Sequence, residues 1–228
     1  MLDFLRFYNR VQRYKAEIRV EVENTSAKAK SGVLIVPVPV STEYQIITPK
    51  FTQPTMDFDF ELQAKEKKVF SVIFEAEVQP RRYTGKIAPE IRQANEFVIE
   101  YLTYGNAIDG LYTAEQAREQ RVVDCGGFDA LLQDELKKKG IESKVVAGFW
   151  SDGGMHAWLE IVHSGECIVA DPSMEYLRRQ GRTRKSGKLG FVGSDRIAFS
   201  IGEPFLQNPF FSGGTALIYE KHFYCARA

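Results

Sequence analysis

Residues 124–140 read DCGGFDALLQDELKKKG, and this stretch decides how the second half of the chain folds. Its apolar residues recur at intervals of three and four, which is the period of one helix face. The members of that face are Cys125, Phe128, Leu131, Leu132 and Leu136. Three lysines follow, which complement the negative end of a helix dipole, and Gly140 is a typical helix stop. The pattern therefore predicts a helix that begins near Cys125.

Three antiparallel strands are expected directly after this helix. Residues 141–149 form a β-rich run, residues 152–154 (Asp-Gly-Gly) a hairpin turn, and residues 155–162 the answering strand. A third strand over 167–170 ends at Asp171-Pro172, a pair that is typical of a strand-ending turn.

Two more helices are expected before the cysteine. Pro89 suits a first helical turn, and apolar residues follow it at helical spacing, which predicts a helix over 89–103. Thr113 and Gln116 have the spacing of a capping box before a short helix that ends near Gln120. The fold class predicted for this half is α+β, with helices packed on an antiparallel sheet.

The first third of the chain has the pattern of strands. Apolar and polar residues alternate strictly over 14–22, 56–64 and 70–78. With a short buried strand at 33–36, this predicts an N-terminal antiparallel β-sandwich over about residues 13–80. We therefore expect two domains, an N-terminal β-sandwich domain at 1–84 and a catalytic domain at 85–228.

Composition limits the class of protein. The 228 residues are 44% hydrophobic and 26% charged, which is enough apolar material for a core, and 30 Lys plus Arg balance 30 Asp plus Glu. With no net field to attract phosphates, we expect no nucleic-acid partner. The most apolar stretch, 32–40, is too short for a membrane span and contains two prolines. The start, MLDFLR, lacks the pattern of a secretion signal. Three cysteines without a CxxC motif do not suggest disulfides. We therefore expect a cytoplasmic location and no membrane partner.

Cys125, His156 and Asp171 are the residue types that thiol catalysis needs. A helix start favours thiolate over thiol, and its unpaired N–H groups can bind the oxyanion of a tetrahedral intermediate. His156 lies on one predicted strand and Asp171 ends the strand paired with it, so a carboxylate could hold the imidazole in one tautomer.

Five motifs carry a family resemblance: 124–128 DCGGF, 139–141 KGI, 146–149 VAGF, 156–160 HAWLE and 171–173 DPS. Together they resemble the transglutaminase-like cysteine-enzyme superfamily, in particular bacterial members that carry an N-terminal β-domain. The resemblance implies that Cys125 is the nucleophile, His156 the general base and acid, and Asp171 the orienting carboxylate. It implies no cofactor and no metal, and nothing in the chain resembles the calcium-binding loops of animal transglutaminases.

Several residues allow two interpretations. Trp158 either binds substrate or packs over the site. Tyr104 and Arg121 are candidates for a second oxyanion donor, and the charge of Asp124 opposes a thiolate at the next residue. The basic segment 178–188 is expected to be a solvated loop, or else a rim of the cleft that favours acidic substrates.

The remaining cysteines and histidines are expected to be structural. Cys167 and Cys225 are assigned packing roles, and His163 and His222 no specific role. Cys125, His156, Cys167 and His163 lack the spacing of a closed zinc site.

The function expected from these observations is thiol-dependent acyl transfer on a protein or peptide amide, with water rather than an amine as the acceptor. A non-catalytic binding or assembly module with a vestigial cleft is the alternative from another class. Arylamine acetyl transfer and glycan-amide hydrolysis use the same three residue types, but no cofactor pocket or glycan signal supports them. Substrate identity and oligomeric state stay open.

Overall fold

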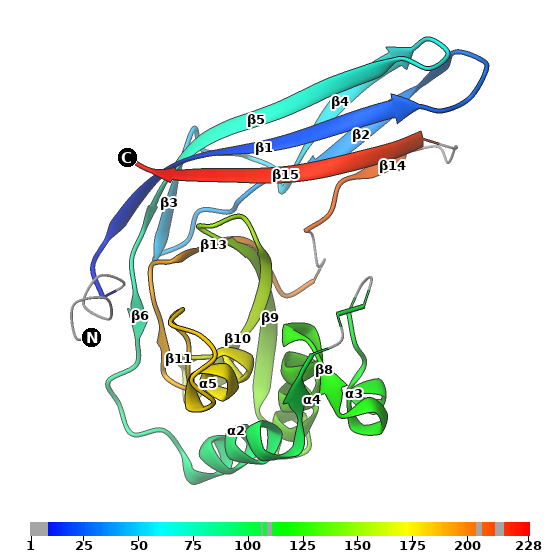
Figure 1. The fold of residues 1–228 in the computed structure, drawn as a ribbon. Helices are drawn as coiled ribbons and strands as arrows, with labels where there is room; N and C mark the ends of the chain where they lie inside the picture. The colour runs from blue at the N-terminus through cyan, green and yellow to red at the C-terminus, as the bar shows by residue number, and fades with distance from the viewer. Residues whose placement is uncertain (1–8, 106, 109–110, 204–206, 213–216) are drawn as a thin grey trace.

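The computed structural model describes residues 9–105, 107–108, 111–203, 207–212 and 217–228. Long antiparallel strands lie at one end of the molecule and helices at the other (Figure 1). A further sheet, β11-β10-β9-β13, lies between them and is called the middle sheet below. The chain start, on which the expectation of no secretion signal rests, lies in residues 1–8, outside the described residues. None of the helices in the described part is long and apolar enough to cross a membrane.

Two antiparallel sheets form the strand-rich end. The first has the order β15-β1-β5-β3, with strands at Leu217–Arg227, Gln12–Asn24, Lys67–Val78 and Gln45–Thr48. The second has the order β14-β2-β4, at Phe210–Ser212, Lys30–Pro37 and Thr55–Leu62. The three strands predicted from alternation, now β1, β4 and β5, and the short buried strand, now β2, are confirmed, whereas β3, β14 and β15 were not predicted.

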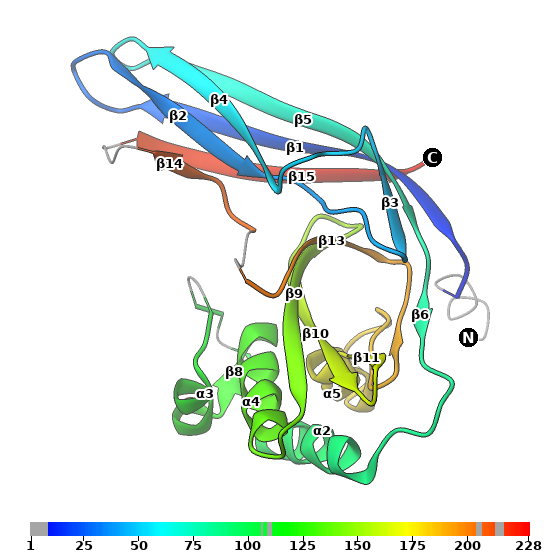
Figure 2. The ribbon, with the colours of Figure 1, turned by 180° about the vertical axis from the view of Figure 1, so that it is seen from behind.

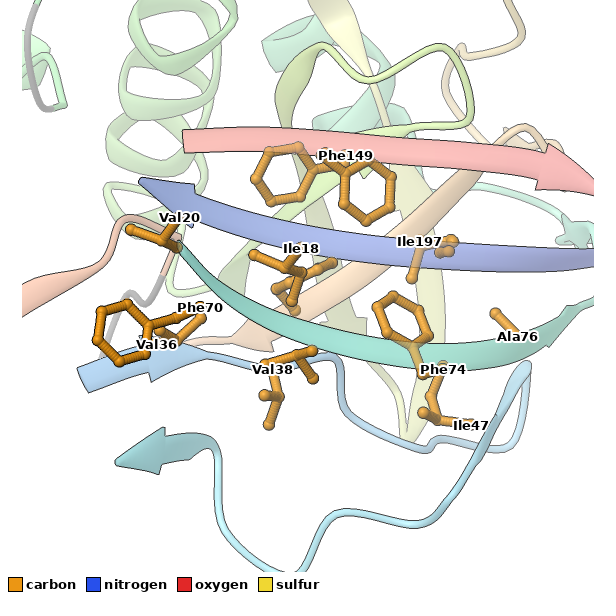
Figure 3. Packing of buried hydrophobic residues seen from close by; sticks show 14 of the residues in the cluster. Ile18, Val20, Val36, Val38, Ile47, Phe70, Phe74, Ala76, Phe149 and Ile197 are labelled. Carbon is orange, nitrogen blue, oxygen red and sulfur yellow. The ribbon is translucent and has the colours of Figure 1, made fainter. Parts of the chain in front are cut away.

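Alternation in the sequence becomes alternation in burial. On β1 every second side chain from Tyr14 to Val22 is buried, and the charged residues between them face outward. Side chains from both sheets meet in one hydrophobic cluster, and Phe149 and Ile197 of the middle sheet join it (Figure 3). The strand-rich end and the middle sheet therefore share a core.

The last described strand, β15, belongs to the first sheet and not to the middle sheet. β15 pairs with β1 along eleven positions, from Tyr14–Arg227 to Asn24–Leu217. Residues 217–227, which the predicted boundary placed in the second domain, are thus part of the first sheet.

The middle sheet forms the centre of the second half of the chain. Its order is β11-β10-β9-β13, all antiparallel, with strands at Glu166–Ala170, Met155–His163, Glu142–Trp150 and Arg196–Ile201. The three strands predicted after the helix are β9, β10 and β11, and they are confirmed. β13 was not predicted as a strand.

Four helices accompany this sheet: α2 at Pro89–Tyr101, α3 at Ala114–Gln120, α4 at Cys125–Lys137 and α5 at Pro172–Arg179. The first three match the predicted helices, and α3 has the predicted capping box at Thr113 and Gln116. Apolar residues of α2, α3 and α4 pack against β10 and β11 in a second cluster, at the end of the molecule away from β1 (Figure 2).

Short strand pairs complete the fold. β6 (Arg81–Arg82) pairs with β12 (Phe191–Val192), and β7 (Thr103–Tyr104) pairs in parallel with β8 (Val122–Val123), immediately before the cysteine.

Residues 171–188 differ in part from the expectation. The third strand ends at Ala170, as predicted, and a helix that was not predicted follows at once: Asp171 caps α5, and Pro172 occupies the first helical turn. In the basic segment, Ser186 and Gly187 are buried, whereas Arg182, Arg184 and Lys188 are exposed, as expected for a solvated segment. Arg179 binds Glu96 and Glu175, and Lys185 pairs with Asp152.

Candidate active site

Cys125 is the first residue of α4, as predicted. Asp124 caps the helix by accepting a hydrogen bond from the Gly127 N–H at 3.3 Å, and strand β8 ends at Val123, directly before this cap. The Cys125 side chain is half-buried and at the end of the helix where backbone N–H groups lack intrahelical partners.

His156 and Asp171 meet behind this helix start. His156 lies on β10 opposite Gly148, and Asp171 follows β11, the strand on the other side of β10. The distance between His156 Nε2 and Asp171 Oδ2 is 2.9 Å, and both residues are buried. The other carboxylate oxygen, Oδ1, accepts from the Met174 N–H and the Ser173 hydroxyl, both at 3.0 Å. The Asp171 carboxylate is thus held at both oxygens.

Arg196 is a member of this network that sequence reasoning missed. Its Nη1 donates to Asp171 Oδ2 at 2.5 Å, the oxygen that also contacts His156, and the residue is 2% exposed. The signal available in the sequence was an arginine just before the apolar run of residues 197–199, where a buried charge needs a partner.

Two tryptophans enclose the histidine. The Trp150 ring stacks on His156 with centroids 4.3 Å apart, and the Trp158 ring stacks at 6.1 Å. Trp158 is 3% exposed, and it lines a small cavity of about 30 Å³ with Tyr44 and Arg81. Trp158 is therefore in a position to support the imidazole by packing, the second of the two interpretations considered for it.

A cavity of about 370 Å³ opens in front of the cysteine. Cys125 and His156 both line it, together with the backbone-neighbouring residues Asp124, Gly126, Met155 and Ala157. The rest of the wall is largely apolar: Tyr104, Ala107, Ile108, Leu111, Gln207, Asn208 and Phe210. No lysine or arginine is among the described residues of this wall.

Of the two candidates for a second oxyanion donor, the structure brings one to the cavity. Tyr104 lines it, and burial, followed by the charges of Cys125 and Asp124, raises the pKa of its hydroxyl, so the group keeps its proton. Arg121 lies over the ring of Tyr101 at 4.6 Å and is not among the lining residues.

The environment of Cys125 disagrees with the expectation of a stabilised thiolate. Burial raises the pKa of the thiol, and the charges of Asp129 and Asp124 raise it further, while the Ala157 N–H acts in the opposite direction. Burial also raises the pKa of Asp129 well above its ordinary value, and neither carboxyl oxygen of that residue has a hydrogen-bond partner among the described residues. The helix start alone does not decide the charge of the thiol.

His156 and Asp171 differ in charge. Burial lowers the pKa of His156, against the attraction of Asp171, so the ring is neutral at neutral pH. Burial by itself would raise the pKa of Asp171, but His156 and Arg196 outweigh it and hold this pKa below its ordinary value. A neutral ring whose Nε2–H donates to an ionised carboxylate leaves Nδ1 free to accept a proton.

The other singled-out residues lie outside this network. Cys167 accepts a hydrogen bond from Arg81 Nη2 at 3.0 Å, and Cys225 lies on β15; both are half-buried free thiols. Among the described residues, no group of three or more His, Cys, Asp or Glu side chains has metal-site geometry.

Fold and site together define a class: α+β proteins in which a cysteine opens a helix packed against an antiparallel sheet. Residues 80–172 match the model of the transglutaminase-like superfamily, so this part of the chain is a domain of that superfamily. The family expected from the sequence motifs is confirmed.

One solved structure has a similar fold. A candidate cysteine protease from Cytophaga hutchinsonii is 14% identical and superimposes with a TM-score of 0.55, over 96% of this chain and 91% of that one. At this identity the likeness shows the fold alone. A TGase, also 14% identical, matches 44% of this chain and 41% of its own with a TM-score of 0.30, too low to support an argument. No curated protein matches the chain.

Proposed function

We propose that this protein is a thiol-dependent acyl-transfer enzyme that acts on protein or peptide amides, with Cys125, His156 and Asp171 as its catalytic triad. The observation that carries the proposal is the buried 2.9 Å contact between His156 Nε2 and Asp171 Oδ2, behind a cavity that His156 shares with Cys125. An imidazole oriented by a carboxylate and facing the same space as a thiol is the arrangement that thiol acyl transfer needs.

The charges suggest how the first step proceeds. Burial favours the neutral forms of both Cys125 and His156. We therefore infer that His156 Nδ1 takes the thiol proton as the sulfur attacks the substrate carbonyl, rather than holding a resting thiolate–imidazolium pair. The same proton then goes to the leaving amine, and a thioester forms on Cys125.

The oxyanion of that step has donors nearby. The backbone N–H groups at the start of α4 are candidates, apart from those of Gly126 and Gly127, which donate to Asp124. The protonated Tyr104 hydroxyl is the second donor that we propose.

We propose water as the acceptor of the acyl group. A cavity of about 370 Å³ is at the small end of the range for ligand sites, roughly 300–1,000 Å³. This space suits one acyl side chain better than an acyl donor and a lysine together.

One observation favours the alternative of a non-catalytic module. The raised pKa of Cys125 is what an inert buried thiol would have. Labelling intact protein with a panel of acyl electrophiles, followed by peptide mass spectrometry, separates the two functions. We expect adducts on Cys125 ahead of Cys167 and Cys225, and loss of this preference in His156→Ala; equal, slow labelling of all three thiols would favour the non-catalytic module.

We also infer that the two strand-rich sheets form a β-sandwich. The hydrophobic cluster that they share supports this architecture.

A further inference from the structure

Arg196 is held by more contacts than a simple ion pair needs. Besides Asp171, its guanidinium donates to the carbonyl and the hydroxyl of Ser186 and lies 3.5 Å from Asp195 Oδ1. Asp195 is fixed in turn by the N–H of Ser186 at 2.8 Å and by its hydroxyl at 2.5 Å. All four residues are almost completely buried, so the guanidinium has one defined orientation.

The same guanidinium is close to the histidine through two other groups. It lies 4.0 Å from the centroid of the Trp150 ring, and that ring stacks on His156. Its Nη1 and the His156 Nε2 share one oxygen, Asp171 Oδ2. Because one oxygen serves both groups, any rotation of Asp171 toward or away from His156 must break a buried charge-assisted hydrogen bond with Arg196.

We propose that Arg196 is a positioning residue of this enzyme, which locks Asp171 against His156 and whose charge opposes formation of the imidazolium. This inference rests on the proposed triad and extends it by a fourth member. Arg196 contacts neither the cavity wall nor the thiol in any described interaction, so it acts only through Asp171 and His156.

The sign of the electrostatic effect follows from the groups that face His156. These are Asp171 from the β11–α5 junction and Asp195 and Arg196 at the start of β13, and Cys125 of α4 lines the same cavity as His156. Arg196 lowers the pKa of His156, whereas Asp195 raises it. Removing the charge of Arg196 should therefore raise the pKa of the His156 imidazole, and removing the charge of Asp195 should lower it. A purely structural role would not give shifts of opposite sign.

The test is a histidine titration of the full chain. Protein labelled with ¹⁵N-histidine gives ring signals for three residues, and His163→Gln and His222→Gln assign the remaining one to His156. We expect the His156 midpoint to rise by about one pH unit in Arg196→Met and to fall by a similar amount in Asp195→Asn. Arg196→Lys keeps the charge and should titrate close to wild type.

A second readout measures positioning. The ring ¹⁵N shifts report the tautomer, and we expect the proton on Nε2 in wild type and Asp195→Asn. In Arg196→Lys, which keeps the charge but not the fork, we expect a mixture of tautomers and slower labelling of Cys125. Lysine has all its donors on one nitrogen, whereas Arg196 reaches Asp171 with Nη1 and Ser186 with Nη2.

The outcomes below would overturn either the role of Arg196 or the proposed function. Shifts of equal sign in Arg196→Met and Asp195→Asn, or no shift in either, would overturn the role of Arg196. If Arg196→Met does not fold, Arg196→Lys decides alone: a single Nε2–H tautomer of His156 together with wild-type labelling of Cys125 would overturn the positioning role. If Cys125 of wild type does not react with acyl electrophiles, the proposed function fails instead, whatever the titration shows.

Discussion

Gly187 approaches Asp171 so closely that a Cβ at Gly187 would lie 2.5 Å from the carboxylate oxygen Oδ2. Its φ is +136°, in the region that side-chain-bearing residues rarely adopt. The chain after α5 therefore closes over the carboxylate that orients the histidine, and only glycine fits there.

Gly187→Ala should displace Asp171 from His156. A shift of this size is expected to slow acyl labelling of Cys125 about a hundredfold. Gly181→Ala is the matched control, because Gly181 also has a positive φ, +68°, but a Cβ there would meet no neighbouring atom of the described residues within 4 Å. The control should cost roughly 1 kcal/mol of stability and leave labelling unchanged. Equal labelling rates for both variants would show that the contact with Asp171 does not matter.

Asp171→Asn should nearly abolish turnover. Asparagine still caps α5, but an amide can hold the wrong imidazole tautomer, so we expect acyl transfer to fall by about 10⁴. Arg196 loses its charged partner, so stability should drop as well, and rates must be compared below the melting temperature of the variant. Ser173→Ala removes a hydrogen bond to Oδ1 alone and is expected to keep most activity. Comparable losses in both variants would argue against a special role for Oδ2.

Asp129→Asn should stabilise the protein increasingly as the pH rises. The raised pKa means that native Asp129 keeps a proton that the unfolded chain releases above about pH 4, so wild-type stability falls with pH in this window by about 1.4 kcal/mol per unit. Urea denaturation from pH 4 to pH 8 measures the difference. Asp134→Asn on the same helix is the control: hydrogen bonds from Arg118 and Lys138 lower the pKa of Asp134, so this carboxyl is ionised in both states above about pH 4 and the substitution should destabilise the protein by an amount that stays nearly constant across this window. A pH-independent effect of Asp129→Asn would mean that this carboxyl is ionised in the native state.

The neutral His156 should make the protein less stable in mild acid. Its native pKa is lowered, so the unfolded chain binds this proton first as the pH falls below about 6.5, and the free energy of unfolding decreases. His156→Gln should remove this part of the pH dependence between pH 6.5 and pH 5, whereas His222→Gln, at an exposed position, should retain it. Parallel curves for wild type and His156→Gln would contradict a neutral buried ring.

Acyl-enzyme breakdown should not depend on added amine. With water as the acceptor, thioester formed from a glutamine or peptide donor is expected to decay at the same rate as a lysine analogue is raised in concentration. A transferase would instead show saturable acceleration and an amide product, because an acceptor site raises the effective amine concentration. Such saturation would reverse the choice of acceptor and leave the thiol mechanism intact.

Local signals in the sequence predicted the elements that carry the site. Helix α4 begins at Cys125 because Asp124 caps it and an apolar face follows, and both features lie within seventeen residues. Helix α5 was missed although Asp171 and Pro172 are a good cap and first turn, because the same pair also ends strands.

What the sequence could not predict depends on contacts between distant residues. The ion pair of Arg196 with Asp171 exists only once β13 has joined the sheet. The charge state of Cys125 depends on burial and on Asp129, which a helix-dipole argument does not include. Strand β15 has no local signal for its pairing with β1, because its partner lies at the other end of the chain.

That pairing sets an order for biosynthesis. β1 leaves the ribosome first, yet one of its edges has no neighbour until residues 217–227 have been made. The helices and the middle sheet lie between these two strands in the chain, and the four strands of that sheet are all available once residue 201 has been made. This sheet can therefore pair while the edge of β1 is still open, and an open edge is a template for pairing with other chains. A chaperone that binds extended segments would protect the molecule at this stage, and messages truncated before codon 217 should yield aggregation-prone protein.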